Sequence, residues 1–96
     1  MNYQNYPAAA KQKAKTAIER NKQTGNRCAT QVGKVRAQQL SQSKPLSETT
    51  IKRTYSYLSR GKTYADSNNP NSCGSISYDL WGGDPMLIYT KKVLKK

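Results

Sequence analysis

The amino-acid sequence predicts an all-α protein, a small bundle of about four helices. Apolar residues recur at helical spacing in several separate segments. Proline, serine, threonine or aspartate stands where these segments begin, and glycine follows several of them, as is typical of helix termini. The chain has 96 residues, of which 34% are hydrophobic, so it forms at most one domain with a small core. Such a core is marginal, and a partner or self-association is one way to complete it.

The first predicted helix covers residues 8–25 and carries little apolar surface. Pro7 stands where helices favour proline, good helix formers follow, and Gly25 closes the segment. The apolar stripe is thin: Ala10, Ala14, Ala17 and Ile18. Because such a helix buries little, we separate a basic N-terminal arm or helix, residues 1–27, from a single small helical domain, residues 28–96. The arm is either a segment that orders on a partner or an ordinary solvated helix.

The best-defined helix signals in the first two thirds of the chain lie in residues 31–60, which predict two helices joined by a tight turn. The first helix follows Thr30, a candidate N-cap. One face of it is formed by residues three to five apart: Val32, Val35, Arg36 and Leu40. Pro45 then ends the pattern, because proline cannot continue a helix and restricts the residue before it.

The second helix of this pair has two distinct sides. Ser47 is a candidate N-cap, and Glu48 follows where a negative charge suits the helix dipole. The apolar stripe consists of Ile51, Tyr55 and Leu58, and the opposite side carries Lys52, Arg53, Ser56 and Arg60. Gly61 is expected to end the helix in a left-handed conformation. The pattern indicates a helix-turn-helix-like hairpin, although an ordinary helical hairpin in a basic protein would show it too.

The C-terminal third predicts a short helix, a break and a last helix. Residues 76–81 alternate apolar and polar like a strand, but their place in a helical chain favours a helix. A double glycine follows, and Asp84 is a candidate N-cap with Pro85 at the first helical position. One side of the last helix is formed by Met86, Tyr89, Thr90, Val93 and Leu94. Trp81, the largest side chain, is expected to be the hub of the core.

The charge of the chain is strongly positive and unevenly distributed. The formal net charge is +12, with 17 Lys and Arg against 5 Asp and Glu. Residues 1–65 hold 13 of the bases and 2 of the acids, residues 66–90 hold no base, and residues 91–96 hold four lysines. A polyanion is the expected partner, contacted by the first two thirds and the C-terminal tip. The C-terminal lysines also complement the helix dipole.

The candidate contact residues are basic or hydroxyl side chains of the predicted helices: Lys11, Lys15, Lys34, Thr49, Lys52, Arg53, Ser56 and Arg60. The lysines and arginines would contact phosphates, which gives affinity and a steep dependence on salt. Thr49, Ser56 and their neighbours would have to reach base edges for any sequence preference. The sequence therefore predicts a nucleic-acid-binding protein, with DNA favoured over RNA.

Other classes of function find no support in the residues. The chain has no histidine, so neither Cys28 nor Cys73 has a base for nucleophilic catalysis, and a zinc site is not expected. No phosphate-loop motif is present, so we predict neither an enzyme nor a cofactor. No apolar run could span a membrane, and the N-terminus lacks the apolar core of a signal peptide. Two cysteines this far apart are expected to be buried free thiols.

The chain resembles a small module of tailed-bacteriophage proteins in three successive motifs, GKVRAQQL, PLSETTIKRTYSYLSR and CGSISYDLWGGDP. This module accompanies head-morphogenesis and prohead-protease genes. The matching positions are Arg36-Ala37, Leu46-Ser47, Thr50-Ile51-Lys52-Arg53 and Ile76 to Asp84, and the resemblance covers residues 8–90. The family often has Arg-His where this chain has Arg60-Gly61. The resemblance implies a phage-encoded protein of the infected host cytoplasm or the virion, and it carries over no catalytic residue.

Two other functions remain open. The protein could be a virion or head-assembly component that binds capsid proteins, with Tyr3 and Tyr6 of an extended tail over residues 1–6 as anchors, or a host-directed inhibitor. Exposure separates assembly from nucleic-acid binding. An exposed patch of aromatic and apolar side chains would favour assembly: Tyr78, Trp81, Met86 and Tyr89. Burial of that patch beside a coherent exposed basic face would favour nucleic acid.

Overall fold

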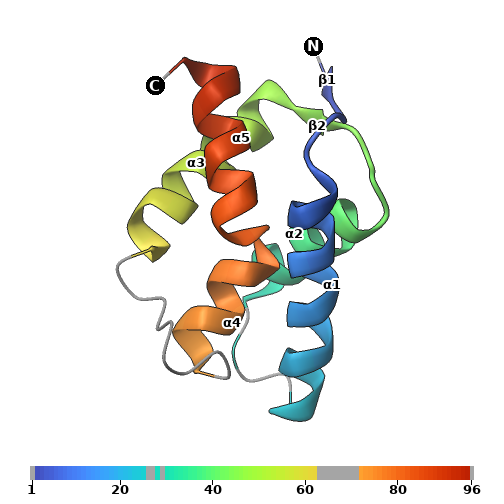
Figure 1. Ribbon diagram of the computed structural model, residues 1–96. Helices are drawn as coiled ribbons and strands as arrows, with labels where there is room; N and C mark the ends of the chain where they lie inside the picture. The colour runs from blue at the N-terminus through green and yellow to red at the C-terminus, as the bar shows by residue number, and fades with distance from the viewer. Residues whose placement is uncertain (1, 26–27, 29, 63–71, 96) are drawn as a thin grey trace.

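The chain is all-α, as the sequence predicts, with five helices and a short two-stranded ribbon over the residues described. The computed structural model describes residues 2–25, 28, 30–62 and 72–95 (Figure 1). In chain order the elements are β1 (Asn2–Tyr3), α1 (Ala8–Gln23), α2 (Gln31–Ser41), β2 (Leu46–Ser47), α3 (Glu48–Gly61), α4 (Cys73–Leu80) and α5 (Gly83–Leu94). Most of the predicted polar loop before Cys73, residues 63–71, lies outside the described part of the chain.

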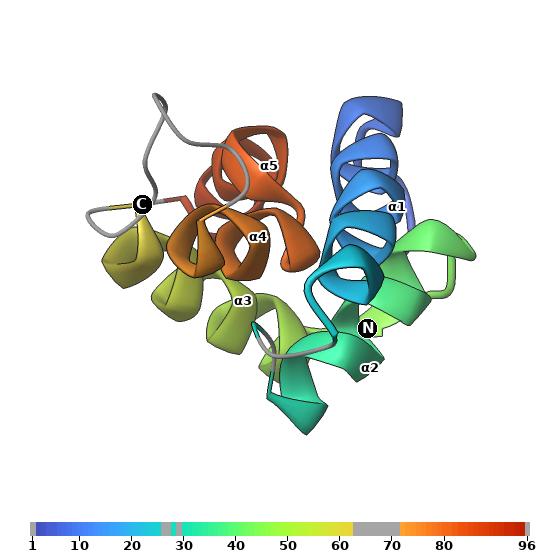
Figure 2. The ribbon, with the colours of Figure 1, turned by 90° about the horizontal axis from the view of Figure 1, so that it is seen from below.

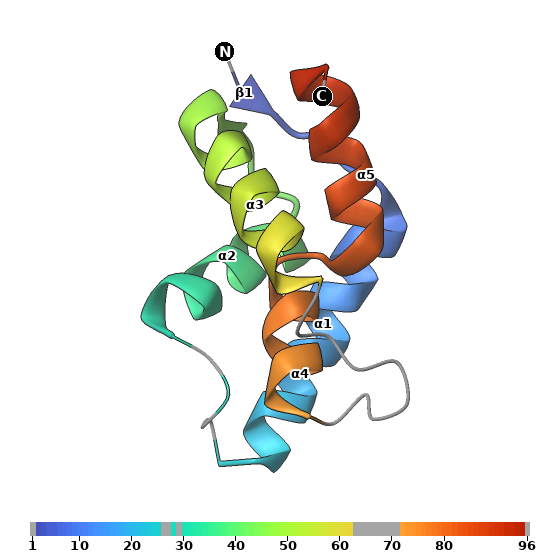
Figure 3. The same ribbon diagram turned by 90° about the vertical axis from the view of Figure 1, so that its left-hand side faces the viewer.

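Helices α4 and α5 lie between α1 and α3, with α2 packed across α1 and α4 (Figures 2 and 3). Helix α1 contacts α2, α4 and α5, and its three stripe alanines, Ala10, Ala14 and Ala17, are fully buried. Small side chains on α1 allow its neighbours to approach closely, so a helix with a thin stripe still belongs to the core. The boundary between an arm over residues 1–27 and a domain over residues 28–96 stays a prediction about independent folding.

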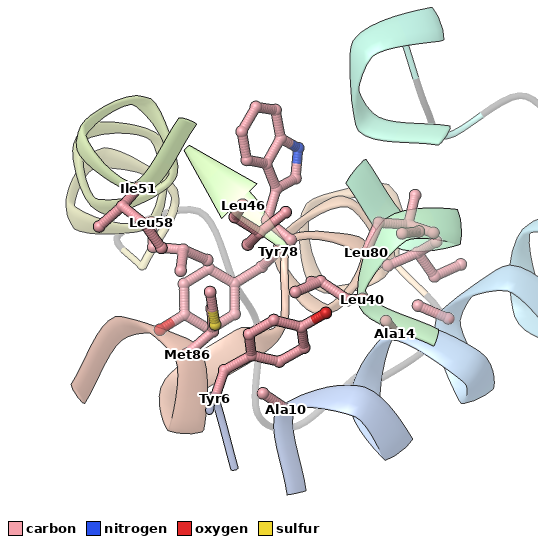
Figure 4. Close-up of a cluster of buried hydrophobic side chains, with 14 of the residues drawn as sticks. Tyr6, Ala10, Ala14, Leu40, Leu46, Ile51, Leu58, Tyr78, Leu80 and Met86 are labelled. Atoms are coloured by element: carbon pink, nitrogen blue, oxygen red, sulfur yellow. The ribbon is translucent and has the colours of Figure 1, made fainter. Parts of the chain in front are cut away.

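The core joins side chains from every helix (Figure 4). Its larger fully buried members are Leu40, Leu46, Ile51, Leu58, Ile76, Leu80 and Met86. The prediction of a short helix over residues 76–81 is confirmed in type, since α4 covers most of that stretch. Its N-cap is Ser72, whose hydroxyl accepts a hydrogen bond from the Ser75 amide.

The N-terminal segment is built into the fold through Tyr6. Strand β1 pairs antiparallel with β2, and Tyr6 behind it is only 3% exposed. The Tyr6 hydroxyl donates hydrogen bonds to the carbonyl oxygens of Lys44, at 2.7 Å, and Gln39, at 3.2 Å. Burial and the nearby Tyr89 raise the pKa of Tyr6, so this hydroxyl stays protonated and donating. Tyr6 is therefore not free to anchor a partner, because it ties the N-terminus to the end of α2.

Helix α2 shows two differences from its predicted form. The Thr30 cap is confirmed, but Val32 and Val35 are 54% and 45% exposed. The buried face is instead rotated toward Gly33, Arg36, Ala37 and Leu40. Gly33 lies so close to Trp81 that a Cβ there would be 3.3 Å from the indole nitrogen. Gly33 therefore faces the core beside Trp81, and the two valines lie on the exposed side of α2.

The link between α2 and α3 is not the predicted tight turn. Ser43 ends α2 with a φ of 56°, and the Lys44 amide bonds to the Gln39 carbonyl, a Schellman-type ending. Strand β2 then occupies part of the connection before Ser47 caps α3, as predicted. Helix α2 packs mainly on α1, whereas α3 packs mainly on α5. The two helices are consecutive but do not form a closely packed hairpin.

Two predicted helix termini are wrong in detail. Gly61 is the last residue of α3 and does not adopt a positive φ. Its missing side chain matters for another reason, since a Cβ there would lie 3.3 Å from the Tyr78 ring. The N-cap of α5 is Gly82, at a φ of 104°, rather than Asp84, which lies in the first turn and accepts a hydrogen bond from the Tyr78 hydroxyl. A side chain at Gly82 would also collide with Met86, so glycine is required there.

The two cysteines are not free thiols, contrary to the prediction. Cys28 and Cys73 form a disulfide with their Cα atoms 4.7 Å apart. The Cys28 amide donates to the Asn21 side chain at 3.1 Å, and the Ser77 hydroxyl donates to the Cys28 carbonyl. The disulfide fixes the connection after α1 to the start of α4. The separation of the two cysteines in the sequence does not predict this bond, because the packing of the helices brings them together.

Replacing Tyr6 by phenylalanine tests the hydrogen bonds at the end of α2. We expect Tyr6→Phe to lower the free energy of unfolding by about 1 kcal/mol, because the ring stays buried but both bonds are lost. Tyr55→Phe is the control, since Tyr55 is only half-buried and no described residue bonds to its hydroxyl. Urea denaturation measures both changes. Equal effects of the two substitutions would contradict the role given to Tyr6.

Removing the disulfide should destabilise the fold. We expect Cys28→Ser/Cys73→Ser to lose about 2–4 kcal/mol in the free energy of unfolding, because the unfolded chain regains the entropy of an open loop. Wild-type protein under reductant should approach the same value, and the double variant should not respond to reductant. Two thiols that react with an alkylating agent in the native, unreduced protein would show that the bond is absent.

Candidate nucleic-acid interface

The outer face of α3 brings together five of the eight predicted contact residues. They are Thr49, Lys52, Arg53, Ser56 and Arg60, and all are exposed. The opposite face of the helix is fully buried through Ile51, Thr54 and Leu58. Residues at these spacings share one side of an α-helix, so the burial of one side fixes the exposure of the other. We call these five residues the α3 face.

The start of α3 is well determined by its sequence. The Ser47 hydroxyl accepts a hydrogen bond from the Thr50 amide at 3.2 Å, and Glu48 lies in the first turn as predicted. The Thr54 hydroxyl donates to the Thr50 carbonyl at 2.7 Å, which lets a polar side chain be fully buried. The α3 face therefore stands on a rigid helix rather than on a loop.

The positive charges at the centre of the α3 face are not neutralised within the described part of the chain. The ion pairs there lie elsewhere: Arg20–Asp79 at 3.8 Å, Lys22–Glu19 at 4.0 Å and Lys62–Asp84 at 3.7 Å. Lys52 and Arg53 take part in none of them. At the far end of the face, the Arg60 guanidinium donates to the Ser56 hydroxyl at 3.3 Å. Lys52 and Arg53 thus offer free positive charge to a partner.

A groove of about 510 Å³ runs along one side of the α3 face, between α3 and the end of α5. Its lining combines charged, hydroxyl and apolar side chains: Glu48, Lys52, Tyr55, Ser56, Val93, Leu94 and Lys95. Lys95 caps α5 in a left-handed conformation, with Lys91 and Lys92 in the turn before it. Lys95 and the α3 face therefore border one groove. Their adjacency depends on the packing of α5 on α3, which no local sequence signal indicates.

The other side of the α3 face meets α2 through Trp81. The Tyr57 and Trp81 rings are stacked, with centroids 4.1 Å apart and an interplanar angle of 14°. The Arg36 guanidinium lies over the indole, 5.3 Å from its centroid. Arg36 also donates to the Gln39 side chain. Burial lowers the pKa of Arg36, and the positive charge of Arg53 lowers it further.

The remaining predicted contact residues lie apart from the α3 face. Lys11 and Lys15 belong to α1, which Figure 2 shows on the other side of α4 and α5. Lys11 is half-buried, with its ammonium 5.1 Å from the Tyr6 ring centroid, whereas Lys15 is exposed. Lys34 is half-buried in a small groove between α1 and α2. The structure thus divides the eight predicted residues into one coherent face and three separate positions.

The side chains whose exposure would favour an assembly role over nucleic-acid binding are mostly buried. Tyr78, Trp81 and Met86 are buried, and Tyr89 is half-buried against the core. They form no exposed aromatic patch. Over the part of the chain that the structure describes, the large exposed apolar side chains lie elsewhere: Val32 and Val35 on α2 and Ile88 on α5. Trp81 packs on Tyr57 and Arg36, so its place is close to the predicted hub of the core.

Within the described ranges, no group of three His, Cys, Asp or Glu side chains could hold a metal ion. None of the helices described is both long enough and apolar enough to cross a membrane. Comparison of the chain with protein-family models, curated proteins and solved structures gave no match.

Proposed function

We propose that this protein binds nucleic acid without catalysing a reaction, mainly through phosphate contacts of the α3 face. The observation that carries the proposal is the exposure of Lys52 and Arg53 side by side on a rigid helix, with no acidic partner among the described residues. Hydroxyl groups of Thr49 and Ser56 flank them. Basic side chains interleaved with hydroxyls are the residue types that contact nucleic-acid backbones.

The size and surroundings of α3 suit a nucleic-acid groove. A helix of 14 residues is about 21 Å long, and the major groove of B-DNA admits a helix of this kind. Lys95 across the groove between α3 and α5 supplies a further positive charge near the same surface. The net charge of +12 raises the local concentration of any polyanion and the rate of encounter with it. These features together favour DNA as the partner.

A second candidate is a role in virion or head assembly through protein contacts. Val32 and Val35 support it, because two large apolar side chains are exposed on one helix. The resemblance to a phage module points the same way, and it would place the protein in an infected host cell or a virion. The buried state of Tyr78, Trp81 and Met86 removes the larger patch that this role would use. Nucleic-acid binding is therefore the preferred function.

Charge reversal on α3 tests the proposal. We expect wild-type protein to bind labelled duplex DNA in fluorescence-anisotropy titrations, with log K falling linearly as log salt concentration rises. Lys52→Glu/Arg53→Glu should weaken binding at least about tenfold and reduce the slope by about 2, since each neutralised phosphate contributes about 0.9. Single-stranded DNA and RNA, titrated in the same way, establish which nucleic acid is preferred.

The control is Lys22→Glu/Lys44→Glu, which reverses two exposed lysines outside α3 and changes the net charge by the same amount. A site on α3 predicts a much smaller loss for this control than for the α3 variant. Circular dichroism and melting temperature verify that both variants fold. Equal losses would indicate nonspecific attraction to net charge, and weak binding of every nucleic acid by the wild type would refute the proposal.

A further inference from the structure

The two cysteines of the disulfide differ in their access to solvent. Cys28 is buried, with 8% of its surface exposed, whereas Cys73 is exposed at the start of α4. A disulfide opens when a thiolate attacks one of its sulfurs and displaces the other, and access helps to decide which sulfur is attacked. Access therefore favours attack on Sγ of Cys73, with Cys28 as the leaving group.

Cys73 lies in a groove of about 400 Å³ between the end of α3 and the start of α4. The lining combines one positive charge with an aromatic ring, a hydroxyl group and two glycines: Tyr57, Arg60, Gly61, Cys73, Gly74 and Ser77. A volume of this order is typical of sites for small molecules. Cys28 is not among these lining residues, so a molecule in the groove would meet Cys73 first.

The surroundings of Cys28 suit a leaving group. The Thr24 hydroxyl lies 3.8 Å from Sγ of Cys28 and donates to the Asn21 carbonyl at 2.8 Å. Because a hydroxyl group can rotate, it can donate to a thiolate instead, and hydrogen bonds to a charged acceptor are the stronger ones. The Cys28 amide and carbonyl are both hydrogen-bonded, to Asn21 and Ser77, which holds this half of the disulfide in place.

Arg60 gives the groove a preference among thiols. Its side chain is exposed, and it brings the positive charge of the end of α3 to the lining that includes Cys73. Guanidinium groups bind carboxylates through parallel N–H donors. A thiol that carries carboxylate groups would therefore be concentrated at the groove, whereas a thiol that carries an ammonium group would be repelled.

We propose that Cys73 is the site at which a small thiol bearing carboxylate groups exchanges with the disulfide. The incoming thiolate forms a bond to Sγ of Cys73, and the bond between the two protein sulfurs breaks. The electron pair of that bond leaves on Sγ of Cys28, which then takes a proton from water. The incoming sulfur is oxidised and the Cys28 sulfur is reduced, so the step needs no further oxidant. The product is a mixed disulfide on Cys73 beside Arg60.

The test treats the oxidised protein with glutathione, a peptide thiol with two carboxylates, in large excess so that the mixed disulfide accumulates. Acid stops the reaction at early times, because it protonates the attacking thiolates. Peptide mass spectrometry then locates the adduct. We expect the early adduct on Cys73 with Cys28 as a free thiol, and an initial rate of opening that is proportional to glutathione concentration.

Two substitutions test the preference for carboxylates. Arg60→Gln should lower the opening rate with glutathione roughly threefold to fivefold at low salt, the size expected for an exposed charge pair. Its rate with cysteamine, a thiol with an ammonium group, should not fall. Lys44→Gln is the matched control, because it removes one exposed positive charge before the opposite end of α3, and it should leave the glutathione rate unchanged.

Several results would overturn the exchange site, whether or not α3 binds nucleic acid. Early adducts on Cys28, or equal adducts on both cysteines, would do so, because an unfolded chain exposes both sulfurs alike. An opening rate that stops rising with glutathione concentration would show that the disulfide reacts only after unfolding. An equal loss of rate with both thiols in Arg60→Gln, or an equal loss with glutathione in Lys44→Gln, would refute selection by the charge of Arg60.

Discussion

The packing of Trp81 is the contact on which the arrangement of the other helices depends. The residue caps α4, and the chain turns at Gly82 directly after it to begin α5. Its ring meets Tyr57 of α3 on one side and Arg36 of α2 on the other. One aromatic side chain from the C-terminal third thus holds α2 and α3, which contact each other little, in a fixed relation. The Tyr57–Trp81 stack thereby links the basic helix α3 to the end of α4.

The small core includes alanines and hydrogen-bonded polar residues beside its larger apolar side chains. Alanines on α1 let α2 and α4 come close, and Thr54 and Thr90 are fully buried because each hydroxyl bonds to a carbonyl of its own helix. Tyr6 adds its ring and two long-range hydrogen bonds. The few acidic side chains are used locally, since Asp79 pairs with Arg20 at 3.8 Å although burial raises its pKa. Among the described residues, Glu19, Asp79 and Asp84 form ion pairs with residues outside the α3 face, and Glu48 lies at its edge.

The sequence predicts those features that depend on one helix at a time. In α3 the apolar and charged residues are sharply divided, so its caps, its buried side and five of the candidate contact residues follow from helical geometry. The buried face of α2 consists of Gly33, Arg36, Ala37 and Leu40. Glycine, arginine and alanine are weakly hydrophobic, so the hydrophobic pattern of the sequence pointed to Val32 and Val35 instead. The cysteine pairing and the Lys95 and Arg36 neighbours of α3 depend on tertiary packing, which periodicity does not describe.

The disulfide closes a covalent ring within the chain. Because Cys28 and Cys73 are 45 positions apart, the bond closes a ring of backbone that includes α2, β2 and α3, while α1 and α5 extend from it as open ends. A single proteolytic cut inside this ring leaves every fragment attached to the rest. Such a nicked molecule would keep its mass on a gel run without reductant, apart from one added water, and would separate into two pieces only after reduction.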